Sequence, residues 1–203
     1  DGYDHLYLYN INGELIRQLT KGEWVVTGFH GFDEEGENAF FNSTEDSPLE
    51  SQVYSVNLKK GKIRKISSGQ GTHKALFSSS KRYFIDQYSS FSKNVTKRYS
   101  LVAKKNRILT ILLDSPDPLK DYDLGETEVF TIENNENTDL YCRLIKPPDF
   151  DPEKKYPVFI YVYGGPHAQL INDSWLAGAG LFLNMMAQKG YIVFTLDNRG
   201  SAN

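Results

Sequence analysis

The sequence has very little cysteine, no long hydrophobic run and no excess of positive charge. Its 203 residues contain a single cysteine, Cys142, which excludes an intramolecular disulfide. No stretch of about 18 apolar residues occurs, so the sequence predicts no membrane-spanning helix. No secretory signal peptide is expected in these residues. Both ends are expected to be cut from a longer protein, because each lies in or directly after strand-like sequence.

The balance of charge and the few histidines also exclude classes of function. Lysine and arginine number 23 against 26 acidic residues, a net charge of −3, so no overall attraction to nucleic acid or to anionic membrane is expected. His5, His30 and His73 show no metal-ligand spacing, and the sequence predicts neither a metal site nor a cofactor. Cys142 lies in the alternating stretch "DLYCRLIKP" and is interpreted as a packed thiol.

What the sequence does contain, over residues 1–114, is a repeat. "LYLYNINGELIRQLTKG" is followed by "VYSVNLKKGKIRKISSG" and by a weaker third copy, which places Tyr7, Tyr54 and Tyr99 in one slot, 47 and then 45 residues apart. Each copy reads as a strand, a turn and a second strand, and a second hairpin lies between copies at 25–44 and at 75–90. Four strands per period of this length indicate β-propeller blades, about two and a half of them.

The pattern changes after a polar segment at 115–127 that is interpreted as a linker. Strands are expected at 128–132, 140–148, 156–163 and 191–197. The third of these is expected to be buried on both faces, because it is continuously apolar. A helix is expected over 173–190, capped by Asp173 or Ser174 and ended by Gly190. Strand, helix and strand in this order predict a right-handed βαβ unit in an α/β sheet.

The turn after the third of these strands, "VYGGPHAQ", is a candidate for chemistry. It follows the carboxyl end of a strand, where α/β sheets place their sites. Gly164 and Gly165 would let the backbone approach a substrate carbonyl, and Tyr163 could donate its phenolic O–H to an oxyanion. The alternative is a plain strand-to-helix turn with an aromatic residue on the core side.

"KKYPVFIYVYGGPHAQ" followed by "GYIVFTLDNRGS" resembles the start of the catalytic domain of the prolyl oligopeptidase family of serine peptidases. "KGEWVVTGF" and "GTHKALFSSSKRYFIDQYSS" resemble the last propeller blades of its dipeptidyl peptidase IV branch. The resemblance implies a β-propeller fragment with all-β blades at 1–114, followed at 128–203 by the N-terminal part of an α/β-hydrolase domain. It covers nearly the whole chain.

The resemblance also implies an activity and its parts. Enzymes of this branch release N-terminal Xaa-Pro or Xaa-Ala dipeptides with a Ser-Asp-His triad, commonly as homodimers outside the cytoplasm. Tyr163 matches the family tyrosine that donates to the oxyanion. The stretch from Asp197 to Ser201 matches a D-x-R-G-S turn, in which Arg199 is expected to organise the loop. No G-x-S-x-G elbow occurs in the 203 residues, so the chain alone is expected to be inactive.

Two further sets of residues have competing interpretations. Glu34 and Glu35 could bind a substrate amine, but their place between two strands favours an exposed hairpin tip. His167 could line a pocket, or it could be an exposed loop residue.

Two other functions stay open for the whole protein. One is a propeller-based module that binds proteins or peptides without catalysis. The other is a sister oligopeptidase or acylaminoacyl peptidase.

Overall fold

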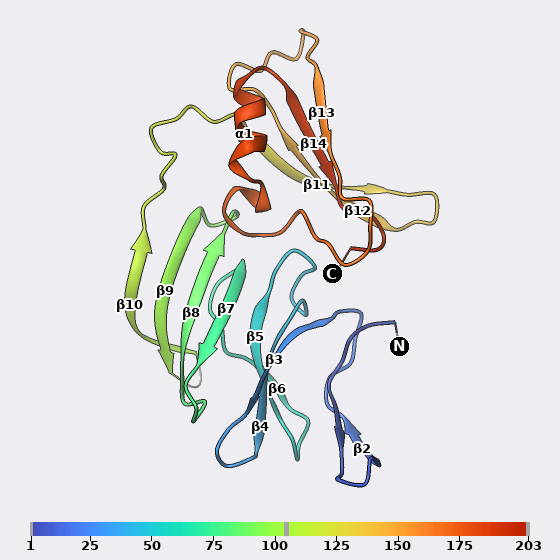
Figure 1. Ribbon diagram of the computed structural model, residues 1–203, viewed down its shortest axis with the longest axis vertical. Coiled ribbons are helices and arrows are strands. Elements are labelled where there is room, and N and C mark those ends of the chain that lie inside the picture. Colours follow the sequence, from blue (N-terminus) through green and yellow to red (C-terminus); the bar gives the residue numbers. More distant parts are fainter. Residues whose placement is uncertain (1, 104–105, 202–203) are drawn as a thin grey trace. The chain divides into compact units, whose positions relative to one another are not determined.

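The computed structural model describes residues 2–103 and 106–201. The chain forms two compact units, one ending at Ser115 and the other beginning at Pro116. In the described residues, strands in four sheets make up nearly all of the regular structure, together with one α-helix and one 3-10 segment (Figure 1).

The first unit consists of antiparallel hairpins. Its strands are β1 (Tyr7–Tyr9), β2 (Leu15–Gln18), β3 (Val26–Phe32), β4 (Asn38–Ser43), β5 (Gln52–Asn57), β6 (Ile63–Lys65), β7 (Thr72–Phe77), β8 (Tyr83–Ser90), β9 (Val95–Ala103) and β10 (Arg107–Ser115). Strands β3 to β6 form one four-stranded sheet in chain order, strands β7 to β10 form another, and β1 pairs with β2. The predicted hairpins are therefore confirmed. Two complete four-stranded sheets and half of a third are consistent with a β-propeller fragment.

Strand β4 packs the sheets of this unit together because its side chains alternate between two apolar clusters. Phe41 is fully buried in a cluster with Leu19 and Tyr54, on the side of the β1–β2 hairpin. Phe40 points to the other face, into a cluster with Phe84 and Val102 of the β7–β10 sheet. Because successive side chains of a strand point to opposite faces, β4 places one large aromatic side chain on each face of its sheet.

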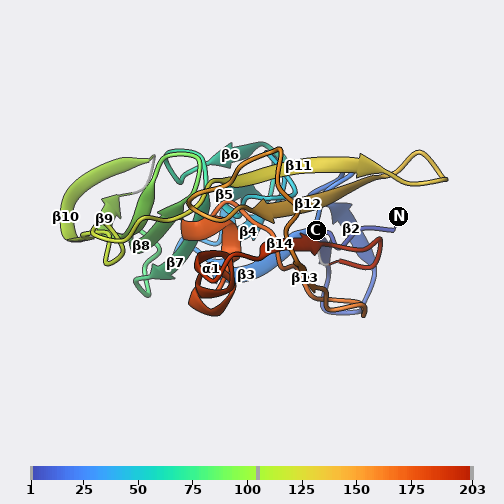
Figure 2. The ribbon, with the colours of Figure 1, turned by 90° about the horizontal axis from the view of Figure 1, so that it is seen from above.

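The second unit is built on one mixed sheet. Its elements are β11 (Thr127–Glu133), β12 (Asp139–Ile145), β13 (Val158–Tyr161), η1 (Trp175–Gly178), α1 (Leu181–Gln188) and β14 (Ile192–Leu196). The strand order is β11-β12-β14-β13, and Figure 2 shows β11 and β12 as a long projecting hairpin. Leu183 and Ala187 of α1 pack on Ile145 and Val193 of the sheet. Strands β13 and β14 are parallel neighbours joined through α1, so the predicted parallel pairing is confirmed.

The predicted burial of β13 on both faces is wrong. Val158, Ile160 and Tyr161 are 55%, 64% and 44% exposed. In the described residues β13 is the last strand of the sheet and pairs only with β14, so its apolar side chains have no neighbour on one side. An apolar strand with an unpaired edge is unusual on a protein surface, because its unpaired N–H and C=O groups can pair with further strands.

The predicted helix is correct at its end and wrong at its start. Gly190 has a φ of +87°, its N–H donates to the Ala187 carbonyl, and the Tyr191 N–H donates to the Met186 carbonyl, which is a Schellman motif. Helix α1 begins only after Gly180, so neither Asp173 nor Ser174 caps it.

The delay has a backbone cause. Leu176 and Ala177 have φ values of 60° and 52°, and these left-handed residues interrupt the right-handed helix that the sequence pattern predicts.

Candidate functional site

Two loops meet at the carboxyl ends of the parallel strands β13 and β14. The first runs from Val162 to the start of α1, and the second is the turn that begins at Asp197. Because parallel strands point the same way, both loops leave the sheet at the same edge, which is where α/β sheets carry ligands and reactive groups.

Tyr163 opens the first loop and its side chain is accessible. The residue is 62% exposed. Gly164 has a φ of +71°, a conformation that favours glycine. A Cβ on Gly165 would lie 2.9 Å from the Tyr163 ring, so glycine is required for the ring to keep this position. The two glycines therefore shape the backbone around a phenol that faces solvent.

Backbone and side-chain hydrogen bonds hold the first loop to the second. The His167 N–H donates to the Gly200 carbonyl at 3.0 Å, and the Asn198 amide donates to the Gly165 carbonyl at 3.5 Å. The Asp197 carboxylate accepts the N–H groups of Leu170 and Ile171, at 2.9 and 3.0 Å. The turn after β14 thus contacts the loop at three points along its length.

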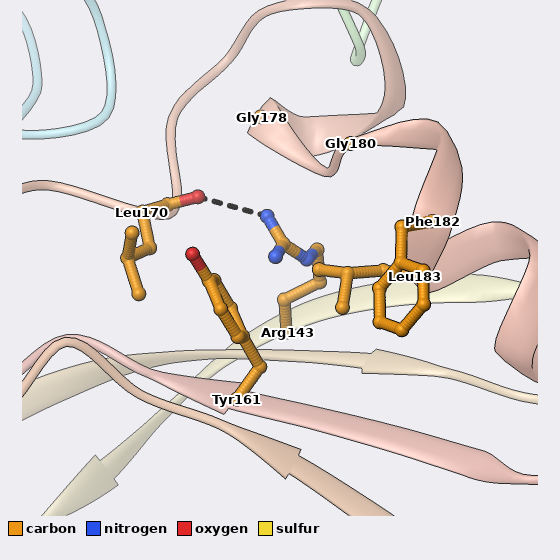
Figure 3. Close-up of a pocket in the computed structure, with 7 residues that line it drawn as sticks. All are labelled: Arg143, Tyr161, Leu170, Gly178, Gly180, Phe182 and Leu183. Atoms are coloured by element: carbon orange, nitrogen blue, oxygen red, sulfur yellow. Dashed lines mark hydrogen bonds between the residues drawn. The ribbon is translucent and has the colours of Figure 1, made fainter.

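A buried arginine holds the same loop from the sheet side. Arg143 of β12 is only 1% exposed. Its Nη1 donates to the carbonyls of Leu170 at 2.8 Å and Ala177 at 2.6 Å, and its Nη2 donates to the Thr195 hydroxyl at 3.1 Å. Figure 3 shows the guanidinium directed at the Leu170 carbonyl, with Gly178 and Gly180 beyond it.

Burial shifts the acid–base properties of both charged groups. Burial lowers the pKa of Arg143 to about 10, although the negative charge of Asp197 opposes this shift. Burial raises the pKa of Asp197, against the opposing effects of the two backbone N–H donors and of Arg143. The guanidinium still carries its charge at neutral pH, so the loop lies beside a permanent buried cation.

Beside Arg143 lies a cavity of about 220 Å³. Tyr161, Phe182 and Leu183 form much of its apolar lining (Figure 3). It lies along β13, the strand with the unpaired edge. An apolar space with one charged neighbour suits burial of further apolar side chains better than binding of a polar ligand.

The other predicted candidates lie elsewhere. Glu34 and Glu35 occupy the turn between β3 and β4, exposed and each 3.6 Å from Arg82, so the hairpin-tip interpretation is confirmed. His167 is exposed in the loop, with a φ of 65°. Arg199 pairs with Glu136 on the β11–β12 turn, whereas Asp197, Asn198 and Gly200 supply the contacts to the first loop.

Sequence reasoning missed Arg143 altogether and assigned no role to the Asp197 carboxylate. Arg143 stands among apolar residues in an alternating strand, next to the buried thiol of Cys142. An arginine in a strand of this kind is a signal of a buried cation, which needs carbonyl or carboxylate partners.

The part of the chain that the structure describes contains neither a cluster of metal-ligating side chains nor a helix able to span a membrane. No group of three or more His, Cys, Asp or Glu side chains there could hold a metal ion. No helix in the same residues is long and apolar enough to cross a membrane.

Comparison with known proteins agrees with the geometry. Residues 1–95 match the family model described as the dipeptidyl peptidase IV N-terminal region. Human dipeptidyl peptidase 8 is 35% identical over 199 residues, which cover 91% of this chain and 22% of that protein. Dipeptidyl peptidase 4 of Arthroderma otae is 33% identical over 207 residues, covering 98% and 26%. The crystal structure of Porphyromonas gingivalis dipeptidyl peptidase 4 matches with a TM-score of 0.88 and 35% identity, over 99% of this chain and 28% of that one.

The resemblance to dipeptidyl peptidase IV is thereby confirmed. The similarity extends beyond the region matched by the family model, through both units and over nearly the whole chain. The chain spans about a quarter of the length of the curated dipeptidyl peptidases that it matches.

Proposed function

We propose that this chain is part of a serine exopeptidase that removes Xaa-Pro or Xaa-Ala dipeptides from the N-termini of peptides. The observation that carries the proposal is the similarity to dipeptidyl peptidases 4 and 8 over more than nine-tenths of the chain. The accessible Tyr163 at the carboxyl edge of a parallel strand pair supports it.

The proposal includes a division of labour between the units. Residues 1–114 are the last blades of a propeller that limits access to peptides, 115–127 are a linker, and 128–203 begin an α/β-hydrolase domain. The unpaired, apolar edge of β13 supports the last assignment, because a further parallel strand could pair there. The proposed protein acts as a homodimer.

In the proposed mechanism, a serine outside these 203 residues attacks the carbonyl carbon of the second substrate residue. The carbonyl oxygen becomes an oxyanion as the tetrahedral intermediate forms, and the Tyr163 O–H donates a hydrogen bond to it. Collapse of the intermediate releases the shortened peptide as an amine, and water then hydrolyses the acyl-enzyme. Tyr163 suits this role because it is 62% exposed at the carboxyl edge of the strand pair and is followed by two glycines, whose backbone can closely approach a substrate.

The test is hydrolysis of a Gly-Pro chromogenic substrate by the full-length protein and its Tyr163→Phe variant. Loss of one oxyanion donor should lower kcat by about 10²–10³-fold with little change in KM. Tyr122→Phe, an exposed tyrosine of the same unit, is the matched control and should behave as the wild type.

The isolated 203-residue chain should show no turnover. Absence of activity in the full-length protein would favour the non-catalytic binding module. Wild-type kcat in Tyr163→Phe would remove the tyrosine from the mechanism.

A further inference from the structure

One peptide group in the loop is bonded at both ends by buried charges. The carbonyl of Leu170 and the N–H of Ile171 belong to the same peptide unit. Arg143 donates to the carbonyl at 2.8 Å, and Asp197 accepts the N–H at 3.0 Å. A cation at the oxygen end and an anion at the nitrogen end both polarise the peptide in the same sense, which strengthens each hydrogen bond.

This arrangement resists movement because release would leave charges without partners. Arg143 is 1% exposed, Asp197 is 4% exposed and Ile171 is fully buried. Moving the loop away would leave two buried ionic groups short of hydrogen bonds, which is costly in a low-dielectric interior. The 170–171 peptide is therefore fixed relative to the sheet.

Arg143 also stabilises a strained turn farther along the loop. Leu176 and Ala177 adopt left-handed backbone angles, which cost free energy for residues with a Cβ. Arg143 donates to the Ala177 carbonyl at 2.6 Å, inside this turn. A Cβ on Gly178 would lie 2.8 Å from the Leu170 oxygen, so the two segments that Arg143 joins are in close contact.

The contacts continue from Asp197 toward Tyr163. Asp197 begins the turn whose Asn198 side chain and Gly200 carbonyl bond to Gly165 and to the His167 N–H. Tyr163 lies two residues before Gly165. The chain of contacts from Arg143 thus ends at the backbone that sets the position of the Tyr163 ring.

We propose that Arg143 is a positioning residue for the reaction: through the 170–171 peptide and Asp197, it holds the loop that presents Tyr163. This inference rests on the proposed function, because it assigns Arg143 an effect on the oxyanion donor. It concerns an interaction made most strongly in the transition state, so its loss should appear in kcat and leave KM nearly unchanged.

The first experiment compares Arg143→Met and Arg143→Lys in the full-length protein, with kcat normalised to active sites titrated by a serine-directed reagent. Arg143→Met should lower kcat by on the order of tenfold to a hundredfold, because small displacements of a catalytic group have effects of this size. Arg143→Lys keeps a charge and hydrogen-bond donors, and should recover part of the loss. Lys154→Met, an exposed surface lysine of the same unit, should match the wild type.

The second experiment is a double-mutant cycle with Tyr163→Phe. If Arg143 acts through the tyrosine, Arg143→Met should lower kcat much less in the Tyr163→Phe background than in the wild type. A purely structural arginine would give equal fold-losses in both backgrounds. Equal losses, or wild-type kcat in folded Arg143 variants, would overturn the proposal.

The outcomes separate this proposal from the proposed function. An inactive wild-type protein contradicts the peptidase assignment itself, whereas an active wild type with additive losses contradicts only the role of Arg143. If Arg143→Met does not fold, the same cycle is run on the smaller loss in Arg143→Lys, and equal fold-losses in the wild-type and Tyr163→Phe backgrounds count against the proposal.

Discussion

The two units fix their turns in different ways. In the first unit, the β3–β4 turn is held by Asp33, whose carboxylate accepts the N–H groups of Glu37 and Asn38, four and five residues away. In the second unit, the loop after β13 is held by Asp197 and Arg143, which lie 26 or more residues from the groups that they bind. The β3–β4 turn is stabilised by a residue of its own segment. The loop after β13 is stabilised by residues that are distant in sequence and that the assembled sheet brings to it.

This difference explains why the hairpins of the first unit follow from a local pattern. Gly36 and Asp33 form their turn wherever two strands flank them. The loop after β13 has no such local rule, because its left-handed residues Leu176 and Ala177 are not turn-forming residue types, and the Ala177 carbonyl takes a hydrogen bond from the distant Arg143. Local turns tolerate changes elsewhere in the molecule, and long-range loops do not.

The largest expected effect is from Asp197→Ala. The substitution leaves the N–H groups of Leu170 and Ile171 without an acceptor beside a buried cation, and should lower the free energy of unfolding of the second unit by about 3 kcal/mol. Hydrogen exchange followed by mass spectrometry measures the protection of the two units separately. Undiminished protection of β12 and β14 would show that the buried charges do not hold the loop.

A smaller effect is expected from Asp33→Ala, the matched change in the first unit. It removes three hydrogen bonds, two from N–H groups and one from the Asn38 side chain. Asp33 is only 5% exposed, but Glu37 is exposed and Asn38 is half-buried, so water can reach the N–H groups that lose the carboxylate, and the loss should be about 1 kcal/mol and confined to β3 and β4. A loss as large as that of Asp197→Ala would contradict the inference that the long-range contacts of Asp197 stabilise their loop more than the local contacts of Asp33 stabilise theirs.

The smallest expected effect is that the stability contributed by Asp46 and the stability contributed by Asp197 change with pH in opposite directions. The pKa of Asp46 in the first unit lies below the usual 3.8: burial acts to raise it, but hydrogen bonds from Lys65 and Tyr54 and the charge of Lys65 lower it further. Burial raises the pKa of Asp197 above 3.8. The stability that Asp46 adds is therefore complete above 3.8 and is lost as pH falls. Asp197 stabilises the fold most below pH 3.8, and the part of its contribution that its raised pKa represents is lost as pH rises through that pKa, while its hydrogen bonds to Leu170 and Ile171 remain.

Unfolding of Asp46→Asn and Asp197→Asn, each compared with the wild type from about pH 3 to about pH 6, measures these contributions. The stability difference between the wild type and Asp46→Asn should grow as pH rises. The corresponding difference for Asp197→Asn should shrink over the same range. Parallel trends would mean that the two carboxylates lie in similar environments.

Much of the architecture could be predicted because it follows from periodicity. Strands that alternate around glycine, asparagine or other polar turns predicted the five hairpins of the first unit, and Gly190 marked the end of α1. The start of α1 could not be predicted, because nothing in the local pattern marks Leu176 and Ala177 as left-handed, and the bond from Arg143 of β12 to the Ala177 carbonyl is a long-range contact. The exposure of β13 also depends on its position at the edge of the sheet. An apolar run in the sequence does not show whether its strand lies at the edge or in the middle of a sheet.

The candidate site divides in the same way. The sequence by itself determined that Tyr163 follows an apolar strand and precedes two glycines, because the covalent chain fixes the order of neighbouring residues. Only the tertiary structure decided that Arg143 and Asp197 bind opposite ends of one peptide in the following loop. The physical reason is that a buried charge takes its partners from whatever the fold brings within hydrogen-bond distance, and three separate segments meet only when the sheet is assembled.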